Sequence, residues 1–502
     1  MEKYDVIIIG SGLGGLQCAY ILSKHGMKVC VLEKHTQPGG CLQTFRRGNH
    51  TFDTGFHYVG GLDEGQALHR LFSYFDLMHL PWLRMDENCF DEVFIEGKSY
   101  RFANGYERFA ETLSEQFPHQ HKNLHDYSMF LREIFENIFV GFGKSESEKH
   151  YVMSLFSQSA YDFLKNAIDD PLLINVLSGS SMKMELNQQT LPLYIFAQIN
   201  SSFIQSAWRL RGNASQITDS LIKSIESNGG IVRTNAEVTR LVEENHKISA
   251  VEINVEERLE ANFYIADTHP AVVIPLIDEG VAIRKIYRKR INNMANTFGM
   301  FKANIVLKEN TVPYLNRNIF VYEKNNVWEY ADYKPENINA CAMVSFRAPD
   351  DGSAFARNID ILTPMYHQEV ERWTDTVSGR RGDDYLSYKN QKVEACLNLI
   401  SGYVPGLANP SAAIDRIYTS TSLSYRDYTG APDGSAFGIR KDCNQLMSTL
   451  LSPRTPEPNL FLTGQNLNLH GMLGVSMTSF FTCAEILGMD KATIGLEIET
   501  KS

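Results

Sequence analysis

The N-terminal segment, residues 5–33, constrains the fold of this chain more than any other stretch. Its four successive pieces are the apolar run 5–9, the glycines Gly10, Gly12 and Gly15, the helical pattern 16–25 and the apolar run 28–33. A short, continuous apolar run is typical of a parallel strand that is buried on both faces. The order strand, glycine-rich turn, helix and strand therefore predicts an α/β fold with a parallel sheet.

The glycines of this turn have a spacing that suits phosphate binding. Gly10 allows a tight turn, Gly12 lets a pyrophosphate approach the backbone, and Gly15 lets the helix pack closely on the strand. The N-terminus of the helix directs unpaired N–H groups at the phosphates. Glu33 ends the second strand, where its carboxylate can accept hydrogen bonds from a ribose. The segment predicts a Rossmann-like, dinucleotide-binding unit rather than an ordinary glycine-rich turn, and the further residues expected at the nucleotide are Ser11, Gly14 and Lys34.

A second glycine pair, Gly39 and Gly40, follows the acid after a short spacer. This extension resembles the flavoproteins of the glutathione reductase and amine oxidase group. The runs 38–41 (Pro-Gly-Gly-Cys) and 52–58 (Phe-Asp-Thr-Gly-Phe-His-Tyr) resemble the phytoene desaturase family. Within it, they are most similar to the retinol saturase and carotenoid isomerase branch. Carotenoid desaturases usually carry a proline after the glycine that matches Gly55, and its absence here argues against desaturation of that type.

A second motif near the C-terminus resembles the one that closes the flavin site in this group. The strand pattern 459–463 runs into a turn, and 470–475 leads into a helix expected over 476–487. The N-terminus of a helix aimed at the N1–C2=O edge of a flavin stabilises the negative charge of the reduced ring. Because the two motifs must meet in space, the cofactor domain is expected to be discontinuous.

The resemblance implies FAD as the cofactor and places two further groups of residues beside it. It also implies a Rossmann-like FAD-binding domain of the glutathione reductase and amine oxidase type, combined with a discontinuous α+β substrate domain. The residues placed at FAD are Gly40, Cys41, Leu42, Thr54, Gly55, His57, Val238 (through its backbone), Gly464, Gly474 and Val475. The segments expected in the FAD-binding domain are 1–75, 206–285 and 441–495, and those in the substrate or lid domain are 76–205 and 286–440.

Two histidines are candidates for a catalytic role. His57 lies just after a motif expected near the flavin, and could donate a hydrogen bond to the ring or a proton to the substrate; the alternative is a structural histidine that holds the loop. His470 lies inside the closing motif. Tyr58 is expected to pack rather than to act as an acid. Cys41 has a position that invites a covalent link to flavin, but the family pattern does not support one.

The chemistry implied is hydride transfer at flavin N5, which serves both saturation and desaturation of a carbon–carbon bond. The substrate implied is a hydrophobic polyene or isoprenoid, such as a retinoid or carotenoid. The sequence lacks a second strand–GxGxxG–helix unit, so a separate NAD(P)H domain is not expected and the electron donor or acceptor is unknown. Two alternatives remain: an amine-oxidase-like flavoenzyme, and a non-catalytic lipid-binding relative such as the escort proteins for prenylated GTPases. The intact glycines and Glu33 favour an enzyme.

Composition excludes several other classes of protein. A net charge of −11 argues against non-specific nucleic-acid binding. The 8 cysteines show no CxxC spacing, so free thiols in a reducing compartment are expected and no metal site is. Neither a signal peptide nor an apolar run long enough to span a membrane is seen, and a cytoplasmic protein is expected. Peripheral membrane contact is compatible with this, because 130–139 carries an apolar stripe that suits either a core-facing helix or a lid or membrane-docking surface.

Overall fold

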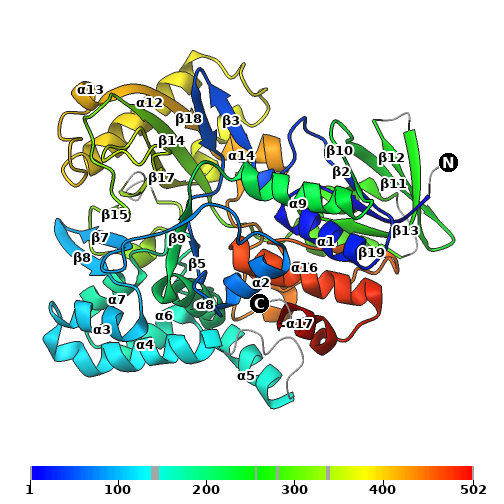
Figure 1. Cartoon of the computed structure of the whole chain (residues 1–502), viewed down its shortest axis with the longest axis horizontal. Helices are drawn as coiled ribbons and strands as arrows, with labels where there is room; N and C mark the ends of the chain where they lie inside the picture. The colour runs from blue at the N-terminus through cyan, green and yellow to red at the C-terminus, as the bar shows by residue number, and fades with distance from the viewer. Residues whose placement is uncertain are drawn as a thin grey trace.

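The computed structural model describes residues 3–136, 146–254, 257–278, 282–334, 338 and 340–499. Two seven-stranded sheets organise these residues, and they lie on opposite sides of the view in Figure 1. Helices α1, α9 and α16 lie against the first sheet, and a separate group of helices lies below the second.

The first sheet contains the N-terminal strand and has the order β10-β2-β1-β13-β12-β11, with β19 paired to the end of β13. The pairs β10–β2, β2–β1, β1–β13 and β13–β19 are parallel, whereas β11, β12 and β13 form an antiparallel meander. Its strands are β1 (Lys3–Ile9), β2 (Val29–Leu32), β10 (Ile231–Arg233), β11 (Val238–Glu244), β12 (Lys247–Ile253), β13 (Glu257–Ala266) and β19 (Leu460–Leu462). Val6 and Ile8 join one apolar core while Ile7 and Ile9 join another, which explains the unbroken apolar run.

Three helices cover one face of this sheet: α1 (Leu13–Lys24), α9 (Ser215–Ser227) and α16 (Gly471–Leu487). The smaller helices of this half are α2 (Ala67–Tyr74), α10 (Pro270–Val273), α11 (Lys285–Asn292), α15 (Leu446–Thr449) and α17 (Lys491–Glu499). The predicted Rossmann-like α/β fold is confirmed. Helix α16 begins at Gly471, before the expected residue 476, because glycines in the first turn lower the helix propensity on which the prediction rested.

The second sheet has the order β18-β14-β17-β16-β15-β7-β8 and is antiparallel except for the pair β15–β7. Its strands are β7 (Asp91–Ile95), β8 (Lys98–Phe102), β14 (Gly299–Leu307), β15 (Asn318–Tyr322), β16 (Cys341–Phe346), β17 (Asn358–Met365) and β18 (Ile414–Ser420). Alternate side chains face opposite layers: Phe320 joins the core with the lower helices, whereas Ile319 and Val321 join the core with α12 (Asp383–Ile400).

The helical layer below this sheet supplies one wall of the site. It comprises α3 (Tyr106–Ser114), α4 (His121–Glu136), α5 (Glu146–Phe156), α6 (Ala160–Ala167), α7 (Pro171–Ser178) and α8 (Leu193–Gln205). On α4, Leu131, Ile134 and Phe135 are buried and Phe130 stacks on Phe163, so the apolar stripe faces the core. Residues 138 and 139 of that stripe lie outside the described residues.

A small sheet, β5-β9-β6, lies between the two halves. The remaining elements are β3 (Thr44–Arg47), β4 (His50–Asp53), β5 (Val59–Gly60), β6 (Trp82–Arg84), β9 (Ala207–Leu210), α13 (Pro410–Ala413) and α14 (Ser422–Thr429). The first large sheet draws its strands from the segments expected in the FAD-binding domain, and the second from those expected in the substrate domain. The boundaries of the two domains stay a prediction.

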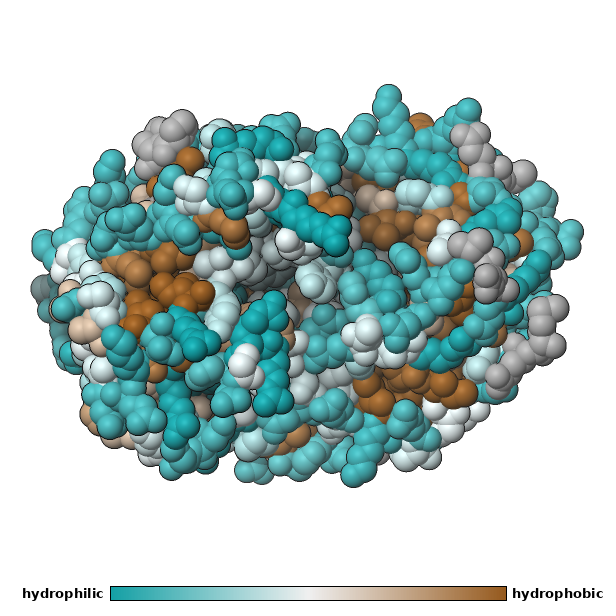
Figure 2. All heavy atoms as spheres, turned by 90° about the horizontal axis from the view of Figure 1, so that it is seen from above, coloured by the Kyte–Doolittle hydropathy of each residue, from teal (hydrophilic) through white to brown (hydrophobic). Residues whose placement is uncertain are grey.

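The outer surface is mostly hydrophilic, with apolar side chains gathered in separate groups on the face shown in Figure 2. Within the described part of the chain, no helix combines the length and the apolar character needed to cross a membrane.

Candidate cofactor and substrate site

The glycine-rich turn and the start of α1 form a cradle of bare backbone. A Cβ atom on Gly12, Gly14 or Gly464 would lie only 2.5 to 2.7 Å from a carboxylate oxygen of Asp267. The carboxylate of Asp267 therefore occupies the space beside these glycines, and a side chain on any of them would have to displace it. Gly10 adopts φ +97°, which only glycine tolerates without strain.

The carboxylate of Asp267 fills the position expected for a pyrophosphate. It follows β13 directly and accepts a hydrogen bond from the backbone N–H of Gly15 in the first turn of α1. Burial and the nearby charge of Glu33 raise the pKa of Asp267 to about 7. An acidic oxygen thus accepts a hydrogen bond at the N-terminus of this helix, and the chemistry of the cradle fits a phosphate group.

Glu33 lies at the end of β2, as predicted, and is buried. One of its oxygens accepts a hydrogen bond from the backbone N–H of Ser11 at 3.1 Å, and the other accepts one from the N–H of His35 at 2.9 Å. The backbone carbonyl of Glu33 accepts a hydrogen bond from the N–H of Ala236. This bond holds the start of β11, at Val238, near the end of β2. Contact of Val238 with adenine stays a prediction, and the side chain of Lys34 is exposed.

Substituting Glu33 by alanine should weaken FAD binding at least about 10-fold, because a buried carboxylate hydrogen bond is worth about 1.5–3 kcal/mol. The FAD content of the purified variant and its Kd for added FAD measure this effect. Glu64→Ala, at an exposed position, is the matched control. An unchanged Kd for Glu33→Ala would refute the ribose contact.

The second glycine pair, Gly39 and Gly40, packs against the glycine-rich turn at Ser11 and Gly12. The N–H of Gly39 donates to the carbonyl of Ser11 at 3.0 Å, and a Cβ on Gly40 would lie 3.1 Å from the Cα of Gly12. The next turn is fixed at Cys41, whose carbonyl accepts hydrogen bonds from the N–H of Gly55 and the hydroxyl of Thr54, each at 3.1 Å.

Cys41 carries a protonated thiol. Although Cys41 is exposed to the cavity, desolvation by the surrounding protein and the charge of Asp267 raise the pKa of its thiol to about 11. A thiolate is the nucleophilic form, so this environment does not favour a covalent bond to flavin.

The closing motif meets the N-terminal motif, as predicted. A Cβ on Gly14 would lie 3.1 Å from the Cα of Gly464. The side chain of Gln17 on α1 donates to Ser476 on α16 at 2.7 Å. A Cβ on Gly474 would collide with the carbonyl of Leu469, so α16 can begin this close to its preceding loop only with glycine there. The N-terminus of α16 is thereby fixed beside the cradle.

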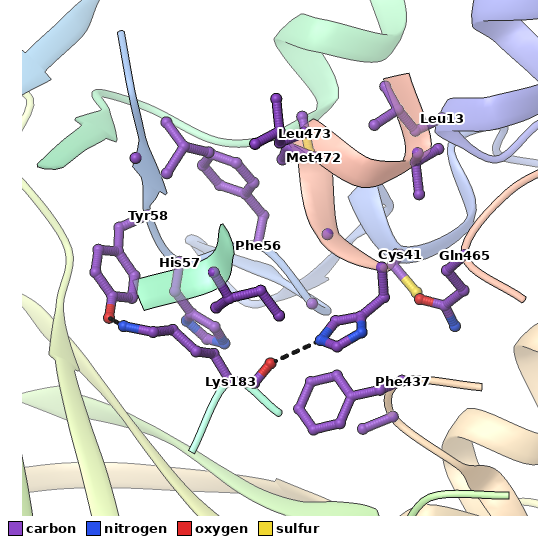
Figure 3. Close-up of a pocket in the computed structure, with 18 of the residues that line it drawn as sticks. Leu13, Cys41, Phe56, His57, Tyr58, Lys183, Phe437, Gln465, Met472 and Leu473 are labelled. Atoms are coloured by element: carbon purple, nitrogen blue, oxygen red, sulfur yellow. Dashed lines mark hydrogen bonds between the residues drawn. The ribbon is translucent and has the colours of Figure 1, made fainter. Parts of the chain in front are cut away.

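A cavity of about 290 Å³ lies beside the cradle, where Leu13 and Gly39 line it, and reaches β14, β16 and β17 of the second sheet (Figure 3). Leu42 and Val475, both predicted at the cofactor, line it, as do Gly55 and Cys41. Most of the other lining is apolar: Leu68, Met182, Ile199, Phe203, Met300, Met343, Leu362, Phe437 and Leu469. Such a cavity suits an apolar ligand that lies against the cofactor.

His57 lines the cavity, and its ring lies beside a charged pair on the second sheet. Its Nδ1 lies 3.7 Å from Asp360, whose carboxylate also lies 3.0 Å from the ammonium of Lys302. Its Nε2 is buried and has no hydrogen-bond partner among the described residues. Burial, with the charges of Lys302 and Arg209, holds the pKa of His57 well below its usual value, so the ring is neutral.

His470 caps the N-terminus of α16 and connects it to the opposite wall. Its Nε2 donates to the backbone carbonyl of Lys183 at 3.0 Å, and its ring packs on Phe437 with centroids 4.8 Å apart. Burial lowers the pKa of His470 to about 4. A neutral ring that is already bound on one side holds the site together, and its catalytic role stays a prediction.

Proteins of similar sequence carry a Rossmann-like domain and are named as oxidoreductases. Residues 8–75 match the family described as an NAD(P)-binding Rossmann-like domain. The chain is 26% identical to all-trans-retinol 13,14-reductase of Rattus norvegicus, over 97% of this chain and 86% of that protein. It is 22% identical to the lycopene-forming phytoene desaturase of Pantoea ananas, over 98% of each. The chain is thus an FAD-dependent oxidoreductase that is similar to the retinol reductases and carotenoid desaturases.

The fold of this oxidoreductase is also found in solved structures. Putrescine oxidase superposes with a TM-score of 0.65 at 15% identity, covering 97% of this chain and 99% of that one. The predicted similarity of the fold to the amine oxidase group is thereby confirmed.

The oxidoreductase also has a polar cluster in its cavity wall that the sequence analysis missed. The hydroxyl of Tyr58 donates to Asp91 at 2.9 Å and accepts a long hydrogen bond from the ammonium of Lys183 at 3.3 Å. Burial and the charge of Asp91 raise the pKa of Tyr58 well above its usual value, so its hydroxyl stays protonated. Tyr58 was expected only to pack, and in the structure it joins a hydrogen-bonded network.

Proposed function

We propose that this oxidoreductase acts on a carbon–carbon bond of a hydrophobic polyene or isoprenoid of the retinoid or carotenoid kind. The observation that carries the proposal is the largely apolar cavity that lies beside the cradle, at Leu13 and Gly39, and is lined by the N-terminus of α16. FAD, when bound, supplies hydride transfer at N5. The names of the relatives support a conjugated substrate, although each name describes only that relative.

The residues of the chain would bind the nucleotide, exclude water and move a proton. The cradle and Glu33 would hold the nucleotide, and the partial positive charge at the start of α16 would favour negative charge on the ring. The apolar walls exclude water and align the substrate. His57, neutral and with Nε2 left available, would accept or return a proton at the substrate, and Asp360 would orient its ring.

Two other functions fit the site less well. A protonated amine would meet the ammonium of Lys183 in a low-dielectric wall, which disfavours an amine oxidase. A non-catalytic lipid carrier has no use for a glycine cradle at the N-terminus of a helix beside a buried Glu33.

The proposal is tested with the purified protein. We expect a flavin absorbance spectrum, release of FAD on denaturation, and reoxidation of the anaerobically reduced protein by all-trans-retinol or a carotenoid. Flavin that is retained but is neither reoxidised nor reduced by any polyene or isoprenoid would overturn the substrate class. A colourless protein that does not bind added FAD would overturn the enzyme as a whole.

Replacing His57 by alanine should lower kcat by about 100-fold or more at unchanged FAD content, the range lost when a general acid or base is removed. Turnover and bound flavin are measured on the same sample. His79→Ala is the control, since the side chain of His79 is 56% exposed. Normal turnover of His57→Ala would leave this histidine a purely structural role.

A further inference from the structure

One of the side chains that line the cavity, that of Lys183, carries a charge at neutral pH. Of the described residues that line it, Lys183 alone is a lysine, arginine, aspartate or glutamate. It lies between α7 and α8, its side chain is 14% exposed, and its ammonium lies 4.1 Å from the centre of the Phe203 ring. Its hydrogen bonds to Tyr58 and Ser180 are long, 3.3 and 3.4 Å. This cation is therefore loosely held by its neighbours.

The charges behind Lys183 do not cancel. Asp91 lies 3.8 Å from its ammonium and is fully buried. The same carboxylate accepts a hydrogen bond from Asn318, and the oxygen of Asn318 in turn accepts one from the buried guanidinium of Arg209. Asp91 thus faces Lys183 directly and Arg209 only through Asn318, and the charges of these three groups sum to one positive charge beside an apolar cavity.

A charge in this position is costly without a partner. Burial lowers the pKa of Lys183 to about 8, although Asp91 opposes the shift. At neutral pH the side chain is still mostly protonated. An anionic or strongly electronegative oxygen on a ligand would relieve this cost by making a charge-assisted hydrogen bond.

We propose that Lys183 binds the carboxylate end of an amphipathic polyene acid and so fixes the direction in which the substrate enters. The inference deepens the proposed function and rests on it. In Figure 3, Lys183 and Tyr58 lie on one side of the cavity and Cys41 on the other. The polyene chain would then extend from Lys183 along the apolar walls toward the cradle.

The test uses cis-parinarate, a conjugated polyene fatty acid that fluoresces in apolar sites, and its uncharged methyl ester. The wild-type protein should bind the acid more tightly than the ester. Lys183→Met keeps the length of the chain and removes the charge. It should weaken binding of the acid roughly 10- to 100-fold, the value of a hydrogen bond to a charged group, and change binding of the ester less than about twofold.

Two further variants complete the design. Lys183→Arg keeps the charge and should keep the preference for the acid, whereas Lys122→Met, at a side chain that is 86% exposed, should change neither affinity. Equal loss of acid and ester in Lys183→Met, no loss of either, or no binding to the wild type would overturn the proposal. Because this readout needs no turnover, a preference for the acid in a protein that fails to oxidise or reduce polyenes would overturn the proposed function alone.

Discussion

Valine in place of Gly12 should leave a folded protein that binds FAD roughly 100-fold more weakly. A side chain at this position would point into the space of the pyrophosphate, and overpacking of a tight contact costs up to about 3 kcal/mol, or roughly 100-fold in Kd. In the absence of FAD, the atom that a Cβ would meet at 2.5 Å is the terminal carboxylate oxygen of Asp267, which can move aside. Folding should therefore survive the change while cofactor binding is weakened.

Gly12 is a better position for this test than Gly15. A Cβ on Gly15 would collide with the backbone carbonyl of Gly10, so a variant there would disturb the turn itself. Gly402 is the matched control, since a Cβ there meets nothing within 4 Å and the position has no positive φ. FAD content, the Kd for added FAD and the thermal unfolding midpoint are measured on both variants. A fully flavinated Gly12→Val protein would show that the cradle does not hold the pyrophosphate.

The part of the site that could be predicted from the sequence is the part built from short contiguous segments. Gly10, Gly12, Gly15 and Glu33 lie within one strand–helix–strand unit, and the backbone conformations that each requires restrict the residue type at that position. The closing motif was located because its glycines stand next to an apolar strand, although its helix was placed too late.

The rest of the site depends on tertiary contacts that leave no local signal. Tyr58, Asp91 and Lys183 come from three segments that only the packing of β7 and α8 around the cavity brings together. Asp267 has a weak signal that could have been used, because an acid directly after an apolar strand parallel to β1 ends at the same edge as the glycine turn. The sequence pattern predicted His57 near the cofactor, but Asp360, which lies beside its ring, is on β17, and Lys302, which pairs with Asp360, is on β14.

The second large effect concerns Asp267, whose carboxylate and the FAD pyrophosphate cannot share the cradle as two anions. Binding of FAD must therefore protonate the carboxylate or displace it from the N–H of Gly15. Below pH 7, near its raised pKa of about 7, Asp267 is mostly neutral and the cost is small. Above pH 7, binding that leaves the Asp267 side chain in place takes up a proton, so the Kd for FAD should rise up to about tenfold per pH unit.

Asparagine at position 267 keeps the shape of the side chain and removes its charge. The variant should bind FAD about 10-fold more tightly than the wild type at pH 8, and its Kd should be nearly constant between pH 6 and 8.5. Glu33 and Cys41 also face the cradle, but the thiol, with a pKa of about 11, does not titrate in this window. Asp76→Asn, at a side chain that is 77% exposed, is the control and should keep the pH dependence of the wild type. Identical profiles for Asp267→Asn and the wild type would mean that the carboxylate leaves the cradle without cost, and the anion position at the start of α1 would then need another explanation.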